Sequence, residues 1–177
     1  AIAEVSKTGE LLSYQTISLH HLLGLSQNSK DQKEWILAHQ LLDLAIQKGK
    51  AIAIENLKKL KKGMRGDGKA TLIKRLHQWN AKKFLQKLKR VAMLKGVEVI
   101  EVHPAYTSVI GMLKYAPQLN IDKDIAGAYV IGRRALGFRE DTPENYERLL
   151  KDKAYLEFAL KRYEEREEEL RELIEKE

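Results

Sequence analysis

The sequence has no cysteine in its 177 residues and no long apolar run. The lack of cysteine excludes a disulfide framework, a Cys-ligated zinc or iron–sulfur centre and a thiol nucleophile, and it favours a cytoplasmic protein. No apolar stretch approaches the roughly 18 to 20 residues that span a bilayer, and residues 1–10 do not read as a basic region followed by an apolar one, so neither a membrane segment nor a signal peptide is expected. Any chemistry must come from carboxylates, hydroxyls, lysine or histidine.

Positive charge is concentrated in one part of the chain. Residues 1–140 contain 24 Lys and Arg against 12 Asp and Glu, whereas residues 141–177 contain 8 against 13. Within the first part, residues 58–95 carry fourteen basic side chains and a single acid, Asp67. Such a segment indicates a polyanionic partner, although a solvated basic helix face would give the same pattern.

Alternating apolar and amphipathic segments predict an α/β domain with a partly parallel sheet. We expect strands over four segments: 1–6, 11–17, 51–54 and 97–102. Residues 7–10 are expected to turn the first two strands into a hairpin. Residues 58–69 are expected to form a loop or a frayed helix, and residues 105–108 to begin a further loop after His103-Pro104.

Three helices are expected where apolar residues recur at every third or fourth position and a glycine follows. The first begins near residue 29 and ends at Gly49, and the second runs from about Trp79 to Gly96. The third begins at Asp122 or Asp124 and ends before Gly137. The second helix should bury an apolar face that includes Phe84, Leu85, Leu88, Val91, Ala92 and Leu94. Its exposed face should carry Lys82, Lys83, Lys87, Lys89, Arg90 and Lys95.

Residues 141–177 are predicted to form a separate acidic helical tail after a domain that covers residues 1–140. Leu149, Leu156, Tyr163 and Leu170 recur every seven residues, but the companion positions are only half apolar. This is a weak coiled-coil signal, so a charged helix that projects from the body or lies along it is the favoured interpretation, and a weak homodimer through this helix is the alternative.

Glu55 is the most suggestive acidic residue in the sequence. It ends the apolar run 51–54, and the carboxyl ends of strands are where an open α/β sheet places its ligand sites. A right-handed crossover could bring Asp122 and Asp124 to the same edge. In the alternative, both aspartates cap a helix and Glu55 pairs with a lysine. A hydroxyl nucleophile is not expected, because no base partner is visible for Thr107 or Ser108, and the five histidines show no metal-ligand spacing.

Four short segments resemble, in the same order, the TnpB/OrfB proteins of insertion sequences. They are the hairpin at 2–11, Ile-Glu-Asn-Leu at 54–57, Val-His-Pro-Ala-Tyr-Thr-Ser at 102–108, and the Asp124 segment at 124–131. The nuclease domain of that family has a RuvC-like, RNase H-type fold, in which helices flank a mixed sheet. The resemblance extends over residues 1 to about 139 and implies this α/β fold here.

The resemblance also implies a transposase-associated DNA endonuclease that holds two Mg²⁺ or Mn²⁺ ions and, in the intact protein, is guided by RNA. Glu55 would be the second catalytic and metal-binding carboxylate and Asp124 the third, with Asp122 as the fallback. Hard divalent cations prefer carboxylate oxygens. Two such ions about 3.5–4 Å apart can activate water and stabilise the leaving oxygen during transposition or DNA recombination.

The sequence departs from the family pattern at two places. The first catalytic Asp, expected on an opening strand, has no counterpart, so we expect that this strand is missing and that the chain is inactive as given. The Cys pairs of the family's zinc ribbon are also absent, so no zinc is expected. An apolar segment at 109–116 is expected to pack on the domain in the place of the ribbon.

DNA is the expected partner, held through phosphates by basic residues beside the site and released as salt rises. The predicted contacts are Lys58, Lys59, Lys61, Lys62, Arg65, Lys69, Lys82, Lys83, Lys87 and Arg90. Trp79 or Phe84 could stack on bases, although their apolar neighbours favour a place in the core. The alternative function is a non-catalytic nucleic-acid-binding protein derived from the same fold.

Overall fold

A computed structural model of the chain describes residues 1–22, 24–57 and 81–140. The chain divides into two compact units, Ala1–Phe138 and Arg139–Glu177. Almost all described residues belong to the first unit. The predictions for the loop at 58–69, for Trp79 and for the acidic helix at 141–177 therefore lie outside the described residues.

The predicted hairpin at the start of the chain is confirmed. β1 (Ile2–Val5) and β2 (Leu11–Gln15) pair antiparallel, from Ile2 opposite Gln15 to Val5 opposite Leu11. Gly9, with φ at 86°, allows the chain to turn, and its N–H donates to the Ser6 carbonyl at 2.9 Å. A single 3-10 turn, η1 (His20–Leu22), follows the hairpin.

The two long helices both end where a glycine favours a helix terminus. α1 (Gln27–Lys48) starts slightly earlier than expected, because Ser26 caps it by accepting the Ser29 N–H at 3.3 Å. The left-handed conformation of Gly49, with φ at 62°, ends it as predicted. α3 (Ala81–Lys95) likewise ends before Gly96, whose φ is 70°.

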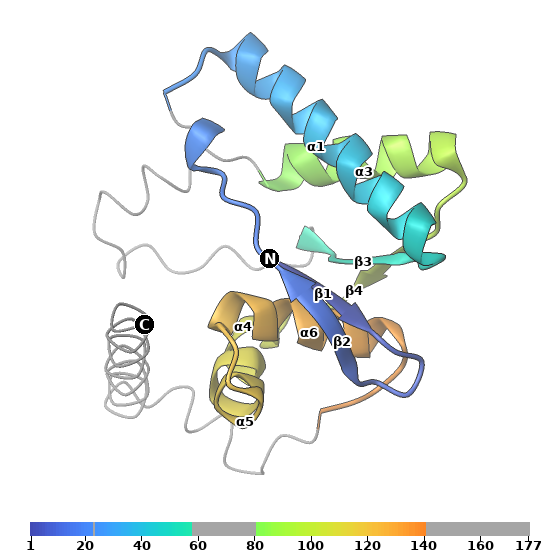
Figure 1. Ribbon diagram of the computed structural model, residues 1–177, viewed down its shortest axis with the longest axis vertical. Helices are drawn as coiled ribbons and strands as arrows, with labels where there is room; N and C mark the ends of the chain where they lie inside the picture. Colours follow the sequence, from blue (N-terminus) through green and yellow to red (C-terminus); the bar gives the residue numbers. More distant parts are fainter. Residues whose placement is uncertain (23, 58–80, 141–177) are drawn as a thin grey trace, which may run out of the picture. The chain divides into compact units, whose positions relative to one another are not determined.

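The two strands that flank α3 form a parallel pair. β3 (Ile52–Glu55) and β4 (Val99–Val102) run from Ile52 opposite Val99 to Glu55 opposite Val102. Figure 1 shows α1 crossing α3 next to these strands. The main core forms between the two helices and one face of the strands, from Ala38, Leu42, Ile54, Phe84, Leu88, Val91 and Ala92. The expected place of Phe84 in the core is therefore confirmed.

Two expectations for the surface of α3 are wrong. Lys87 is not on an exposed face: only 11% of its side chain is exposed, and it binds Asp31 and the buried Glu34 of α1. These hydrogen bonds outweigh the effect of burial and raise the pKa of Lys87. Leu94 is 79% exposed, whereas Val91 and Ala92 of the same helical turn are each 1% exposed, so Leu94 lies outside the face of α3 that packs into the core. The acids of α1 thus convert part of the basic face into a helix–helix interface.

Residues 107–119 are helical, whereas a loop was expected to begin at 105–108. α4 (Thr107–Ile110), a π-helical turn η3 (Gly111–Tyr115) and α5 (Ala116–Leu119) follow one another directly. The segment packs against α6 (Lys123–Ala135), as expected for its apolar part. A Cβ on Gly111 would lie 2.5 Å from the Gly127 nitrogen, so the two backbones meet where only glycine fits.

The described strands form two separate two-stranded sheets, β1–β2 and β3–β4. The unit is therefore mixed α/β, but these strands do not form the single sheet that the resemblance implies. α6 packs against β1, β3 and β4 and so contacts both sheets. Lys50, just before β3, donates from Nζ to the Val5 carbonyl at the end of β1, at 3.1 Å. Strand pairing does not join the sheets, but α6 and Lys50 do.

The hairpin turn is fixed to α6 through one carbonyl. The Gly9 oxygen accepts from the Tyr129 hydroxyl at 2.5 Å and from Arg133 Nη1 at 2.8 Å. The Arg133 guanidinium also lies 4.7 Å from the Phe138 ring centre and 5.6 Å from that of Tyr115. These cation–π contacts place the charge among aromatic rings and orient it toward the turn.

Candidate functional site

Glu55 lies at the carboxyl end of β3, on the face of the strand opposite the main core. Successive side chains of a strand point to opposite faces, and Ile52 and Ile54 pack toward α1 and α3. Glu55 therefore faces the side of α4 and α6. There the hydroxyl of Thr107, at the start of α4, donates to Glu55 Oε1. Among the residues that the structure describes, the Glu55 carboxylate thus has a hydroxyl partner.

A small hollow lies beside Glu55. Its volume is about 30 Å³, which is room for about two water molecules. Polar side chains border it, and Asn56 Nδ2 donates to Glu101 Oε2 at 3.2 Å across the two strands. Glu101 also forms an ion pair with Lys89 of α3. The residues that line the hollow are Glu55, Asn56, Leu57, Lys82, Leu85, Gln86, Lys89 and Glu101.

Asp122 and Asp124 have different places at the start of α6. Asp122 is the N-cap, and its side chain accepts the Asp124 N–H at 2.7 Å. This confirms the prediction that Asp122 caps the helix. Asp122, the fallback for the third metal-binding carboxylate, therefore has a structural role at the start of α6. Asp124 lies in the first helical turn and is exposed, where the helix dipole favours a negative charge.

The segments that carry Glu55 and Asp124 meet through α4. Thr107 binds Glu55, and the next residue, Ser108, packs on α6: a Cβ on Gly127 would lie 3.7 Å from the Ser108 Cα. Gly127 follows Asp124 by three residues, a rise of about 4.5 Å along a helix. Through these contacts, the segment that carries Glu55 reaches α6 about one helical turn from Asp124.

The carboxylates of Glu55 and Asp124 are the type of ligand that divalent cations prefer, but the two alone do not form a complete site. Two carboxylates on neighbouring elements match the one or two that Mg²⁺ commonly uses. In residues 1–22, 24–57 and 81–140, no group of three or more acidic or histidine side chains is arranged to hold a metal ion. These residues therefore offer at most part of the three-carboxylate set that the resemblance implies.

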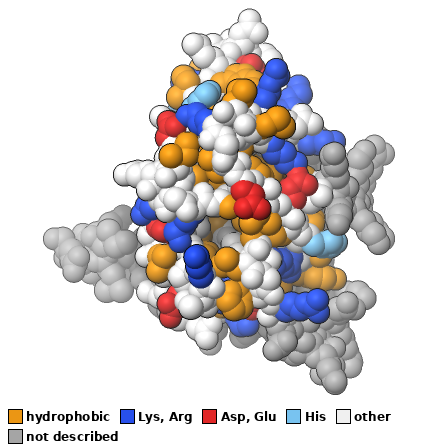
Figure 2. All heavy atoms as spheres, turned by 90° about the vertical axis from the view of Figure 1, so that its right-hand side faces the viewer, with side chains coloured by type: hydrophobic (Ala, Val, Ile, Leu, Met, Phe, Trp, Pro, Cys, Tyr) orange, Lys and Arg blue, Asp and Glu red, His pale blue; other side chains and the backbone are white. Residues whose placement is uncertain are grey.

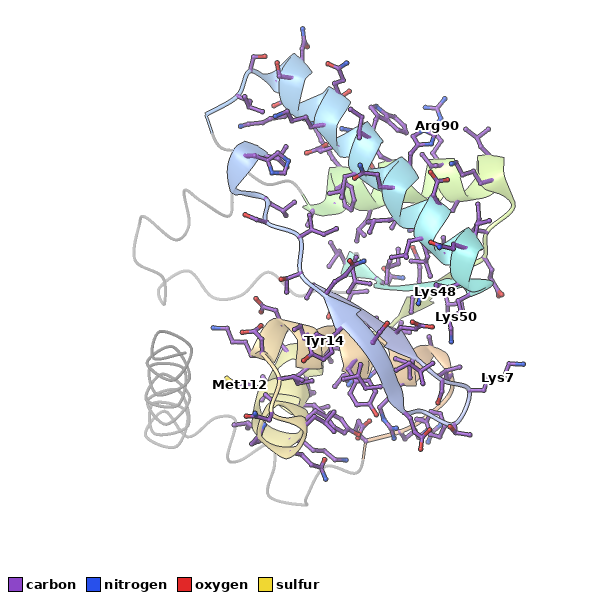
Figure 3. The ribbon with its side chains drawn as sticks, in the orientation of Figure 1. Lys7, Tyr14, Lys48, Lys50, Arg90 and Met112 are labelled. Atoms are coloured by element: carbon purple, nitrogen blue, oxygen red, sulfur yellow. The ribbon has the colours of Figure 1, made fainter. Side chains whose placement is uncertain are left out.

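The predicted nucleic-acid contacts separate into several groups. Lys58, Lys59, Lys61, Lys62, Arg65 and Lys69 lie outside the described residues. Lys82 lines the hollow with Glu55, whereas Arg90 extends from α3 away from the strands (Figure 3). Lys83 is exposed on α3, and Lys87 is committed to its ion pairs with α1. Lys82 is therefore the described basic residue with a predicted role that lines the same hollow as Glu55, on the α3 side of the strands.

Basic side chains are spread over a face of the molecule rather than gathered in one patch. Figure 2 shows Lys and Arg side chains across this face with Asp and Glu among them. Acids neutralise lysines elsewhere among the described residues too, as in the pair of Lys95 with Asp43 at 2.5 Å. In the described part of the chain, no helix has the length and apolar character needed to cross a membrane.

Sequence reasoning missed Thr107 and the Asn56–Glu101–Lys89 network. It considered Thr107 only as a nucleophile, and the acid that it binds is 52 residues away. No local pattern signals this pair, because the parallel β3–β4 crossover is what brings the residues together. Glu101 and Lys89 are ordinary residues of an alternating strand and a basic helix, so their pairing carries no sequence signal either.

Comparisons with known protein families, with curated proteins and with solved structures find no match to this chain. The resemblance to the TnpB/OrfB proteins therefore rests on the four segments at 2–11, 54–57, 102–108 and 124–131 and stays a prediction.

Proposed function

We propose that residues 1–140 are the RuvC-like domain of a metal-dependent DNA endonuclease of the TnpB/OrfB type, guided by RNA in the intact protein. Glu55 and Asp124 supply two of its metal-binding carboxylates, for Mg²⁺ or Mn²⁺. The observation that carries the proposal is the contact path from Glu55 through Thr107 and Ser108 to Gly127, close to Asp124 on α6. Two segments that resemble catalytic segments of the family are thus neighbours, although 69 positions separate the two acids.

The proposal extends to the fold. We propose that β1–β2 and β3–β4 are the two halves of one RNase H-like sheet, with an additional strand between β1 and β3. Two-stranded sheets are marginally stable alone, and α6 already contacts both pairs. The added strand would carry the first catalytic Asp and would complete the metal-binding set. The chain of 177 residues is accordingly expected to bind metal weakly and not to cleave DNA.

Mn²⁺ binding to the full 177-residue chain tests the site, with affinity measured by water-proton relaxation. Glu55→Gln and Asp124→Asn are each expected to weaken binding about tenfold or more, because each removes a charged ligand. Asp43→Asn is the matched control: Asp43 is an exposed acid paired with Lys95 on another surface, and its loss should leave Mn²⁺ affinity unchanged.

Two results would contradict parts of the proposal. Equal Mn²⁺ affinity in the unmodified chain and both site variants would remove the metal site and the nuclease function with it. Cleavage of single-stranded DNA by the unmodified chain, lost in Glu55→Gln, would keep the nuclease and refute the need for a further strand.

The second candidate is a non-catalytic nucleic-acid-binding protein. It is favoured by the exposed basic residues of α3, which need no metal to bind phosphate. DNA affinity that falls steeply between about 50 and 200 mM salt, combined with Mn²⁺ affinity that Glu55→Gln does not change, would select this alternative. A DNA affinity that does not change over this salt range would exclude nucleic-acid binding by the exposed basic residues of α3.

A further inference from the structure

Thr107 is a buried polar residue whose hydroxyl has two acceptors within reach. Its side chain is 2% exposed, and Oγ1 lies near both Glu55 Oε1 and the Pro104 carbonyl, the latter at 3.1 Å. A hydroxyl has one proton to donate, and an ionised acceptor binds it more strongly than a neutral one. The Thr107 hydroxyl therefore donates its proton to Glu55, and this hydrogen bond joins α4 to β3.

The backbone before Thr107 adopts an uncommon conformation. Tyr106 has φ at 62° and ψ at 10°, in the left-handed region that L-residues rarely adopt. Tyr106 is 46% exposed, so burial of its ring does not require this conformation. The conformation lets α4 start at Thr107, three residues after Pro104, with Thr107 turned inward.

Hydrogen bonds hold the whole corner in this form. The Ala105 N–H donates to His103 Nδ1 at 3.2 Å. Arg134 of α6 donates from Nη1 to the His103 carbonyl at 2.6 Å. Thr107 is therefore carried by a corner that is fixed to α6, the helix that also carries Asp124. Such an arrangement is what a group that orients a metal ligand requires.

We propose that Thr107 is a positioning residue for Glu55: its hydroxyl holds Oε1, and Oε2 would be the oxygen left to bind a divalent metal ion. This inference rests on the proposed function, since it assumes that Glu55 is a metal ligand. Outer-shell hydrogen bonds of this kind restrict the rotation of a ligating carboxylate, so less freedom is lost when the ion binds.

The test compares Thr107→Val, which keeps the shape and removes the hydroxyl, with Thr107→Ser, which keeps the hydroxyl. Mn²⁺ affinity of the full chain is measured by water-proton relaxation. Thr107→Val is expected to weaken binding about tenfold or more, and Thr107→Ser should restore it to within about twofold. Ser108→Ala, the loss of the exposed neighbouring hydroxyl, is the control and should change nothing.

A second measurement tests the hydrogen bond without metal. Urea unfolding is followed for Thr107→Val, Glu55→Ala and the double variant. If the bond exists in solution, the two changes are coupled, and the unfolding constant of the double variant differs about tenfold from the product of the single effects. Independent effects would overturn the proposal, even where a Thr107→Val protein binds Mn²⁺ too poorly to measure.

The outcomes separate this inference from the proposed function. Mn²⁺ affinity that falls in Glu55→Gln but not in Thr107→Val overturns the positioning role alone. Mn²⁺ affinity that falls in neither variant overturns the proposed function and the positioning role together. A loss in Thr107→Val that Thr107→Ser does not restore also overturns the role of the hydroxyl, because the defect would then come from packing.

Discussion

The two faces of β3 are built in different ways. Ile52 and Ile54 face an apolar core in which Leu42 of α1 is completely buried. On the opposite face, Glu55 meets a buried hydroxyl, and the backbones of η3 and α6 approach so closely that Gly111 has no room for a side chain. Both faces bury apolar side chains, among them Val102, Ala126 and Val130 on the side of α6, but this second side adds specific polar and backbone contacts.

The main core on one face of β3 serves stability, whereas the candidate site lies on the opposite face. An apolar core tolerates rearrangement as long as volume is conserved, whereas a hydrogen bond or a backbone contact depends on the position of each atom. The second face can therefore hold Glu55 in one orientation, which the first could not do. Three sets of substitutions test the comparison, from the largest expected effect to the smallest.

The apolar face is tested by Leu42→Ala. Leu42 is 0% exposed, so its truncation leaves a cavity and should lower the free energy of unfolding by about 3 kcal/mol, measured in urea. Leu94→Ala is the matched control, because Leu94 is 79% exposed, and it should change stability by no more than about 0.5 kcal/mol. A loss of similar size in both variants would contradict the assignment of Leu42 to the core and of Leu94 to the surface.

The opposite face is tested by two glycines that lie against each other. Gly111→Ala forces a methyl group to within 2.5 Å of the Gly127 nitrogen and should cost about 2 kcal/mol. Gly127→Ala meets only the Ser108 Cα at 3.7 Å and should be neutral or stabilise α6 by up to about 1 kcal/mol. Thermal unfolding measures both, and equal effects would refute the asymmetric approach of the two backbones.

The connection between the hairpin and β3 is tested by Glu4→Gln and pH. The hydrogen bond from Ser13, followed by Lys48, lowers the pKa of Glu4 below 4.5. The ionised form is thus favoured in the folded protein, and its contribution to stability is present above pH 4.5 and disappears as the pH falls through the lowered value. Figure 3 shows Lys48 and Lys50 together beside β1, and both pair with Glu4.

Glu4→Gln should therefore have a slightly lower melting temperature than the unmodified chain at pH 7, and the difference should shrink as the pH falls below 4.5 and the Glu4 carboxylate is protonated. The effect is expected to be the smallest of the three because ion pairs near the surface contribute little. Glu98→Gln, at an exposed acid before β4, serves as the control over the same pH range. A difference that does not shrink as the pH falls would show that the effect is not electrostatic.

Local rules predicted most elements of the fold. Gly49 and Gly96 are strong terminus signals, and the helices α1 and α3 end where they occur, whereas α1 starts at the Ser26 cap, before the expected start near residue 29. The expected loop after Pro104 was wrong because α4 starts from Tyr106 in a left-handed conformation that Tyr rarely adopts. No propensity predicts such a start, since its cost must be offset by contacts with other elements.

The candidate site was predictable only in part. Glu55 was identified because it ends an apolar strand, and the cap position of Asp122 follows from its place before a helix. The sequence does not show that Lys87 forms ion pairs, because its acidic partners lie on α1, more than fifty positions away. A basic helix has the same pattern whether its lysines face water or a second helix.

Local sequence patterns by themselves determined the hairpin, the helices α1, α3 and α6, the strand that ends at Glu55 and the separation of basic and acidic segments. These depend on neighbours in the chain, which local patterns record. Only the tertiary structure decided that the strands form two pairs, that Lys87 is paired and that Thr107 binds Glu55. Those contacts join residues distant in sequence, and the geometry of packing selects them.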